Sequence, residues 1–169
     1  MVVVRPTQKA LRRFPQPASS DLRESTTILG DWYVNLLFTR RARLVLVVSE
    51  RSLLSILLPA NDFGNFMPRL RSSVERLLVT LGAPRTSVAA ELREMQQAVV
   101  ARTINRRVLG SMNDLAYQVR VRLELEPATA VGSLEVELSG VPLSFIGYRQ
   151  PAEVAVGLLS GVGATRAVH

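Results

Sequence analysis

The feature that most constrains the fold is a run of three short apolar segments joined by polar links, at residues 32–39, 44–48 and 53–58. The first alternates between a strongly apolar and a more polar face, which is typical of a β-strand. The second is apolar on both faces, which suits a central strand. Because the links between the segments are short enough for hairpins, we expect an antiparallel β-meander.

Turn residues and helical periodicity place further elements on both sides of this meander. In chain order these elements are a strand over 1–6, a short helix capped by Thr7 and ending at Arg13, a surface loop over 15–24, a helix over 70–81 closed by Gly82, a second helix from Ser87, a strand over 97–102, and a last helix from Pro151 closed by Gly161.

Two stretches fit more than one structure. Residues 117–125 alternate as a strand would, yet a helical stripe of Met112, Leu115, Val119 and Leu123 covers the same region. Ser111 and Asp114 have the spacing of a capping box, so we expect a helix from about Met112 that ends at Pro127. Residues 128–141 remain open between helix and strand.

Together these elements predict one α+β domain over residues 1–169, in which helices cover one side of an antiparallel sheet of about four or five strands. A length of 169 residues is usual for a single domain. Residues 161–169 are small and polar, and we expect them to form a frayed tail.

The residue inventory excludes several classes of chemistry. The chain has no cysteine, and its one histidine is His169 in the expected tail, so zinc sites and catalytic triads have no ligands or bases. The acidic residues show no paired spacing, and we expect neither a metal nor a cofactor. No apolar run is long enough to span a membrane and the N-terminus has no signal-peptide pattern, so we expect a cytoplasmic protein.

A formal net charge of +7 favours an anionic partner, either nucleic acid or an acidic protein. The chain has 21 basic residues, and all of them except Lys9 are arginine. Because that bias is also typical of a GC-rich genome, the choice of arginine alone says little about phosphate recognition.

Polar and basic residues are concentrated just before the expected helix at Met112. The candidates for an anion site are Asn105, Arg106, Arg107, Ser111 and Asn113. Free backbone N–H groups at a helix start, with two arginines upstream, could hold a phosphate or carboxylate. The alternative is that Ser111 caps the helix and the arginines are solvated or paired with surface acids.

A second basic cluster, Arg40, Arg41 and Arg43, is expected at the tip of the first hairpin. It could form a phosphate-binding patch, joined by the arginines at 12, 13 and 51. The alternative is that these arginines guard an exposed strand edge against aggregation.

Trp32 and Tyr33 could line a ligand pocket, but a lone tryptophan in a chain poor in aromatics is more typical of the core.

Several short motifs together resemble an uncharacterised bacterial domain family of unknown function. They are Arg5 to Lys9, Gly30 to Tyr33 with Asn35, Asn105 with Arg107 to Asp114, Pro142, Gly147 with Tyr148, and Pro151. The most specific is Arg-x-x-Leu-Gly-Ser-Met-Asn-Asp. The resemblance implies a bacterial origin and a helix after Gly110, and it supplies no activity, ligand or catalytic residue.

The leading functional hypothesis is therefore a small accessory protein that binds an anionic partner through the arginines near 40–43 and 106–107. One alternative is a histidine-free enzyme for a phosphorylated or nucleotide substrate near residues 105–114, which would need a deep cleft with Asp114 turned inward. Another is a protein–protein module of a toxin–antitoxin or defence pair, or a homodimer built on an exposed sheet edge.

Overall fold

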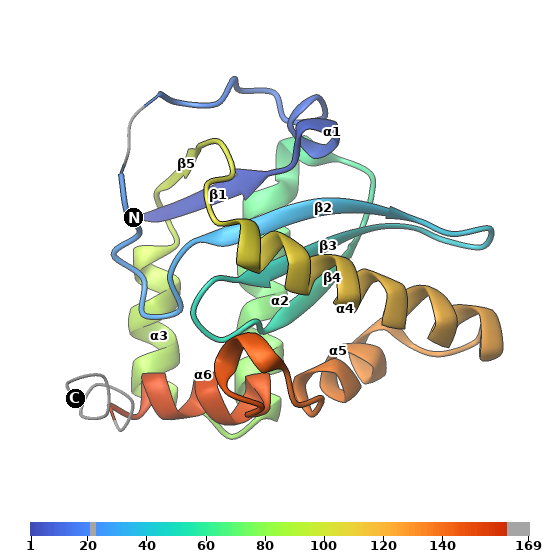
Figure 1. The fold of residues 1–169 in the computed structure, drawn as a ribbon. Coiled ribbons are helices and arrows are strands. Elements are labelled where there is room, and N and C mark those ends of the chain that lie inside the picture. The colour runs from blue at the N-terminus through green and yellow to red at the C-terminus, as the bar shows by residue number, and fades with distance from the viewer. Residues whose placement is uncertain (21–22, 162–169) are drawn as a thin grey trace.

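A computed structural model describes residues 1–20 and 23–161, and the expected tail, including His169, lies almost entirely outside them. Its five-stranded sheet has the order β4-β3-β2-β1-β5. The strands are β1 (Val2–Pro6), β2 (Trp32–Phe38), β3 (Arg43–Ser49), β4 (Ser55–Pro59) and β5 (Ala98–Val100). Figure 1 shows them in the middle of the molecule.

The sheet is mixed. The predicted meander is confirmed for β2, β3 and β4, which pair antiparallel. However, β1 lies parallel to both β2 and β5, with Val4 opposite Trp32 on one side and Val100 on the other. The purely antiparallel prediction was wrong because β1 and β2 are joined by a long segment, which returns the chain to the same end of the sheet before β2 begins.

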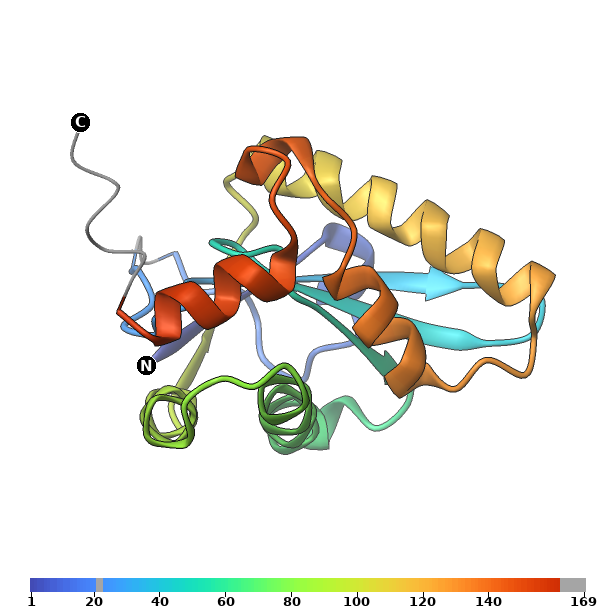
Figure 2. The ribbon, with the colours of Figure 1, turned by 90° about the horizontal axis from the view of Figure 1, so that it is seen from below.

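Helices cover both faces of the sheet (Figures 1 and 2). One face holds α1 (Gln8–Leu11), α2 (Phe66–Thr80) and α3 (Arg85–Glu94), and the other holds α4 (Arg106–Leu125). The apolar side chains of α5 (Val131–Ser139) pack on the α4 side, whereas α6 (Pro151–Leu159) contributes to both sides, with Ala155 and Leu159 toward α2 and Val154 toward α4. The prediction of one covered face was therefore wrong. The physical reason is visible in β3, whose side chains from Leu44 to Val48 are all buried, which requires apolar cover on both sides.

Two apolar cores result, one on each face of the sheet. Alternate residues of β2 divide between them: Trp32 and Val34 pack toward α2 and α3, whereas Tyr33 and Leu37 pack toward α4. Trp32 and Tyr33 are fully buried, so the interpretation of both as core residues is confirmed. The helix expected over 117–125 is confirmed as part of α4, and the open stretch at 128–141 contains α5.

The outer edge of β4 is covered by α5. The backbone N–H of Leu57 donates to Glu135 Oε1 at 2.9 Å, and Arg76 pairs with the other carboxylate oxygen at 2.8 Å. On the opposite edge, β5 is three residues long, and the N–H of Ser19 donates to the carbonyl of Val100 at 2.7 Å. One edge of the sheet is thus contacted by α5, and the other edge is short.

Candidate functional site

A buried ion pair joins β1 to the segment that precedes β2. Arg5 Nε donates to Asp31 Oδ2, and the two side chains are 3% and 6% exposed. The remaining guanidinium nitrogens of Arg5 donate to the carbonyl of Arg102 at 2.7 Å and to that of Arg23 at 3.3 Å. The side chain of Arg5 thus fastens the segments before β2 and after β5 to β1.

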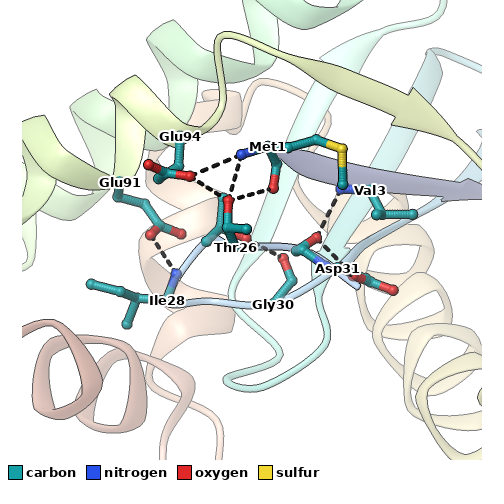
Figure 3. Close-up of polar contacts among 10 residues, drawn as sticks. Met1, Val3, Thr26, Ile28, Gly30, Asp31, Glu91 and Glu94 are labelled. Carbon is teal, nitrogen blue, oxygen red and sulfur yellow. Dashed lines mark hydrogen bonds and ion pairs between the residues drawn. The ribbon is translucent and has the colours of Figure 1, made fainter. Parts of the chain in front are cut away.

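Two carboxylates shape the turn before β2 (Figure 3). Asp31 Oδ1 accepts from the backbone N–H of Ser25 at 3.2 Å and from its hydroxyl at 2.7 Å. Glu91, which reaches the turn from α3, accepts from the N–H groups of Ile28 and Leu29 at 2.7 and 3.1 Å. Burial raises the pKa of Glu91, and these two hydrogen bonds oppose the rise.

The start of α4 is anchored by a network of side chains. The backbone N–H of Asn105 donates to the Tyr33 hydroxyl at 3.2 Å, and Asn105 Nδ2 donates to Glu50 at 3.3 Å. Asn105 Oδ1 accepts from the N–H groups of Arg107 and Val108 and so caps the helix. Burial, followed by the nearby Glu50 carboxylate, raises the pKa of Tyr33.

The predicted helix start was wrong, because α4 begins at Arg106 and not near Met112. Ser111 therefore lies inside the helix, where its N–H and that of Met112 are used by the helix itself, and the pairing of Ser111 with Asp114 as a capping box does not occur. An anion site on those two N–H groups is excluded. The enzyme hypothesis required Asp114 to turn inward into a deep cleft. Asp114 is instead exposed.

The five predicted anion-site residues do not converge on one point. Asn105 is used as the cap, Ser111 is half-buried within the helix, and the guanidinium of Arg107 lies 5.3 Å from the ring centroid of Phe145. Arg106 and Asn113 are exposed, and they point outward from α4. Two of the five are therefore available to a partner on the outer surface of this helix.

The arginines at 40–43 lie at the tip of the β2–β3 hairpin, as predicted. This tip and the C-terminal part of α4 border a depression of about 390 Å³, lined by Thr39, Arg40, Arg41, Leu123 and Glu124. Arg43 lies over the ring of Phe38 at 5.8 Å. Because β3 is an interior strand, the interpretation of these arginines as guards of a strand edge was wrong.

Arg51 is not part of this tip. It lies beyond the opposite end of β3, where its guanidinium donates to the carbonyl of Ile28 at 3.2 Å and its methylene groups pack against Gly30. Gly30 has a φ of +79°, and a side chain there would meet Arg51 at 3.0 Å. Arg51 therefore supports the turn before β2.

Comparison with family profiles tests the resemblance to a domain family of unknown function that the motifs indicated. The profile described as "Domain of unknown function (DUF6933)" matches residues 3–154. The chain belongs to this family. The matched part of the DUF6933 domain begins within β1, includes the other four strands and ends within α6. Comparison with curated proteins and with solved structures gives no match.

Three of the motifs that carried the resemblance, at residues 5–9, at 30–33 with Asn35, and at Asn105, meet at one junction of the DUF6933 domain. Arg5 pairs with Asp31, and the Asn105 N–H bonds to Tyr33. Thr7 occupies the N-cap position of α1 as predicted, but its hydroxyl donates to Asn35 Oδ1 at 3.0 Å and not to the helix. These contacts hold β1, β2 and the start of α4 together. Their first role is therefore architectural.

The described part of the DUF6933 domain contains no group of three or more histidine, cysteine or acidic side chains that could hold a metal ion. No helix in this part is both long and apolar enough to cross a bilayer.

The residues that the structure adds to the candidate set are Tyr117 and Arg120, which are exposed on α4. Their helical spacing from Arg106 would have indicated them, had the helix been predicted to start there.

Proposed function

We propose that the outer face of α4 binds nucleic acid. The observation that supports this function most is a stripe of exposed side chains, at Arg106, Asn113, Tyr117 and Arg120, along a helix of 20 residues. Intervals of three, four and seven residues place them on one side of the helix. The opposite side packs against the sheet through Val108, Met112, Leu115 and Val119.

The charges on this face suit a polyanion. Among the described residues, the guanidinium groups of Arg106 and Arg120 make no hydrogen bond or ion pair, and neither do those of Arg40 and Arg41 at the neighbouring hairpin tip. A helix of this length extends about 30 Å, close to one turn of duplex. Cationic groups are thus spread along the helix and beyond its C-terminal part, where phosphates of one strand or duplex could meet them.

The side chains between the arginines favour nucleic acid over an acidic protein. Tyr117 is 67% exposed, and a solvent-facing tyrosine beside arginines offers a surface on which bases stack. Asn113, four residues away on the same stripe, can donate and accept hydrogen bonds with base edges. Two exposed acids on α4, Asp114 and Glu124, balance the charges of Arg106 and Arg120, and Glu124 follows Arg120 by four residues on the same stripe. The excess of positive charge on this face therefore comes from Arg40 and Arg41 at the hairpin tip.

The proposal is tested by fluorescence anisotropy with labelled single-stranded and duplex 20-mers between 50 and 200 mM salt. We expect the double variant Arg106→Ala/Arg120→Ala to bind more weakly and to lose about one unit of the log–log salt slope per arginine. The matched control is Arg85→Ala/Arg93→Ala, which removes the same charge from α3 on the other face of the sheet.

Two results would overturn the proposal. One is the absence of binding to either 20-mer at low salt, together with retention of an acidic polypeptide such as polyglutamate. The other is an equal loss of affinity in the α4 variant and the α3 variant, since that would mean that the overall charge of +7 attracts polyanions without a preferred face.

A further inference from the structure

The segments that follow the parallel neighbours β1 and β5 lead to opposite faces of the sheet. After β1 it continues into α1, whose Ala10 is buried in the core shared with α2 and α3. After β5 it crosses to the other face and enters α4, whose Val108 is buried in the opposite core. In open α/β sheets, a reversal of this kind leaves a crevice outside the strand ends, and ligands bind there.

A crevice of about 310 Å³ occupies this position. Its walls are Pro6, Gln8 and Leu11 on the β1–α1 side and Arg102 and Thr103 on the β5–α4 side. The register that pairs Val4 with Val100 also brings Pro6 beside Arg102, two residues further along each strand. This volume is within the range of small-molecule sites in proteins.

The crevice has fixed walls. The carbonyl of Arg102 accepts from Arg5 Nη1 at 2.7 Å, and the N–H of Ala101 donates to the carbonyl of Val4 at 2.9 Å. Arg5 is itself held by the buried pair with Asp31. The backbone that presents Arg102 and Thr103 is therefore held by β1, and a ligand would bind without first ordering a loop.

The polar groups in the walls are free to contact a ligand. Among the described residues, the side chains of Gln8, Arg102 and Thr103 make no hydrogen bond or ion pair with the protein. Pro6 and Leu11 add an apolar surface, and no acidic residue lines the crevice. Lys9 adds positive charge next to Gln8.

We propose that this crevice binds a small organic anion. Its phosphate or carboxylate pairs with the Arg102 guanidinium and takes hydrogen bonds from Gln8 and Thr103, and its apolar part lies on Pro6 and Leu11. The site is separate from the outer face of α4, and it does not depend on nucleic-acid binding there.

The test is a ¹⁵N-correlation NMR titration of the full chain with phenyl phosphate, and in parallel with benzoate and with inorganic phosphate. We expect saturable shifts at Gln8, Arg102 and Thr103, with tighter binding of an organic anion than of inorganic phosphate. The relative affinities of phenyl phosphate and benzoate then identify the preferred oxyanion. Arg102→Gln, which keeps the carbonyl that Arg5 binds, should weaken binding by about tenfold.

Two control variants separate a built site from general charge attraction. Arg85→Gln removes an exposed arginine on α3 and should leave phenyl phosphate binding unchanged, as should Arg93→Gln on the same helix. Thr103→Val changes no charge and should weaken binding a few-fold. Shifts spread over exposed arginines, or equal losses in Arg102→Gln and Arg85→Gln with none in Thr103→Val, would overturn the proposal.

Discussion

The hydroxyl of Tyr33, on β2, accepts a hydrogen bond from the backbone N–H of Asn105 at 3.2 Å. Tyr33 is fully buried in the sheet, and Asn105 is the N-cap residue of α4. The contact therefore ties the start of α4 to β2. The side chain of Asn105 then caps the helix. The position of the proposed nucleic-acid face therefore depends on a contact between residues distant in the sequence.

Removal of this contact should destabilise the protein. We expect Tyr33→Phe to lower the free energy of unfolding by about 1–3 kcal/mol, because the Asn105 N–H loses its acceptor in a partly buried place. Urea denaturation measures the change, and amide exchange should accelerate at Asn105. Tyr117→Phe is the matched control on an exposed ring, and an equal effect of the two variants would contradict this role of Tyr33.

The two possible caps of α4 give opposite expectations. Asn105→Ala should cost about 1 kcal/mol, since the N–H groups of Arg107 and Val108 lose their acceptor. Ser111→Ala should leave stability almost unchanged or slightly raise it, because alanine is favourable inside a helix. Thermal unfolding of both variants distinguishes these positions, and the reverse order of stabilities would place the helix start at Ser111.

The buried pair should be sensitive to the loss of either partner. We expect Arg5→Met or Asp31→Asn to lower the free energy of unfolding by about 3–5 kcal/mol, because each leaves the other charge without its main partner. The exposed pair of Arg122 with Glu137 is the comparison, and Arg122→Met should have little effect. Denaturant titrations that show similar small losses for the buried and exposed pairs would contradict this account.

Glu91 should make stability depend on pH in a defined direction. Burial raises its pKa in the folded state above the ordinary value of 4.5, so the folded protein holds this proton more tightly than the unfolded chain does. The stability of the wild type relative to Glu91→Gln should therefore fall as the pH rises from below 4.5 through the folded pKa. Urea denaturation across this window, with an NMR titration of Glu91, measures it. A folded pKa at or below 4.5 would contradict the expectation.

The sequence was sufficient for most elements because their signals are local. The meander of β2, β3 and β4, the helix closed by Gly82 and the helix from Pro151 all follow from periodicity and turn residues. The cover on both faces agrees with the apolar pattern of residues 44–48, because a strand that is apolar on both sides needs helices on both faces of the sheet.

The remaining features depend on contacts between distant segments. Ser111 and Asp114 imitate a capping box, and only Tyr33 and Glu50, brought close by the sheet, distinguish Asn105 as the real cap. The parallel pairing of β1 with β5 depends on the path of the whole chain between them. For the same reason Arg102 and Gln8, which line one crevice, could not be grouped from their positions in the sequence.

NMR mapping of the protein with an unlabelled single-stranded 20-mer shows whether the outer face of α4 binds nucleic acid. We expect chemical-shift changes to concentrate at Arg106, Asn113, Tyr117 and Arg120 and at the hairpin tip, with small changes on α2 and α3. Changes that spread evenly over exposed arginines of both faces, or their absence at Tyr117 and Asn113, would contradict the proposed function.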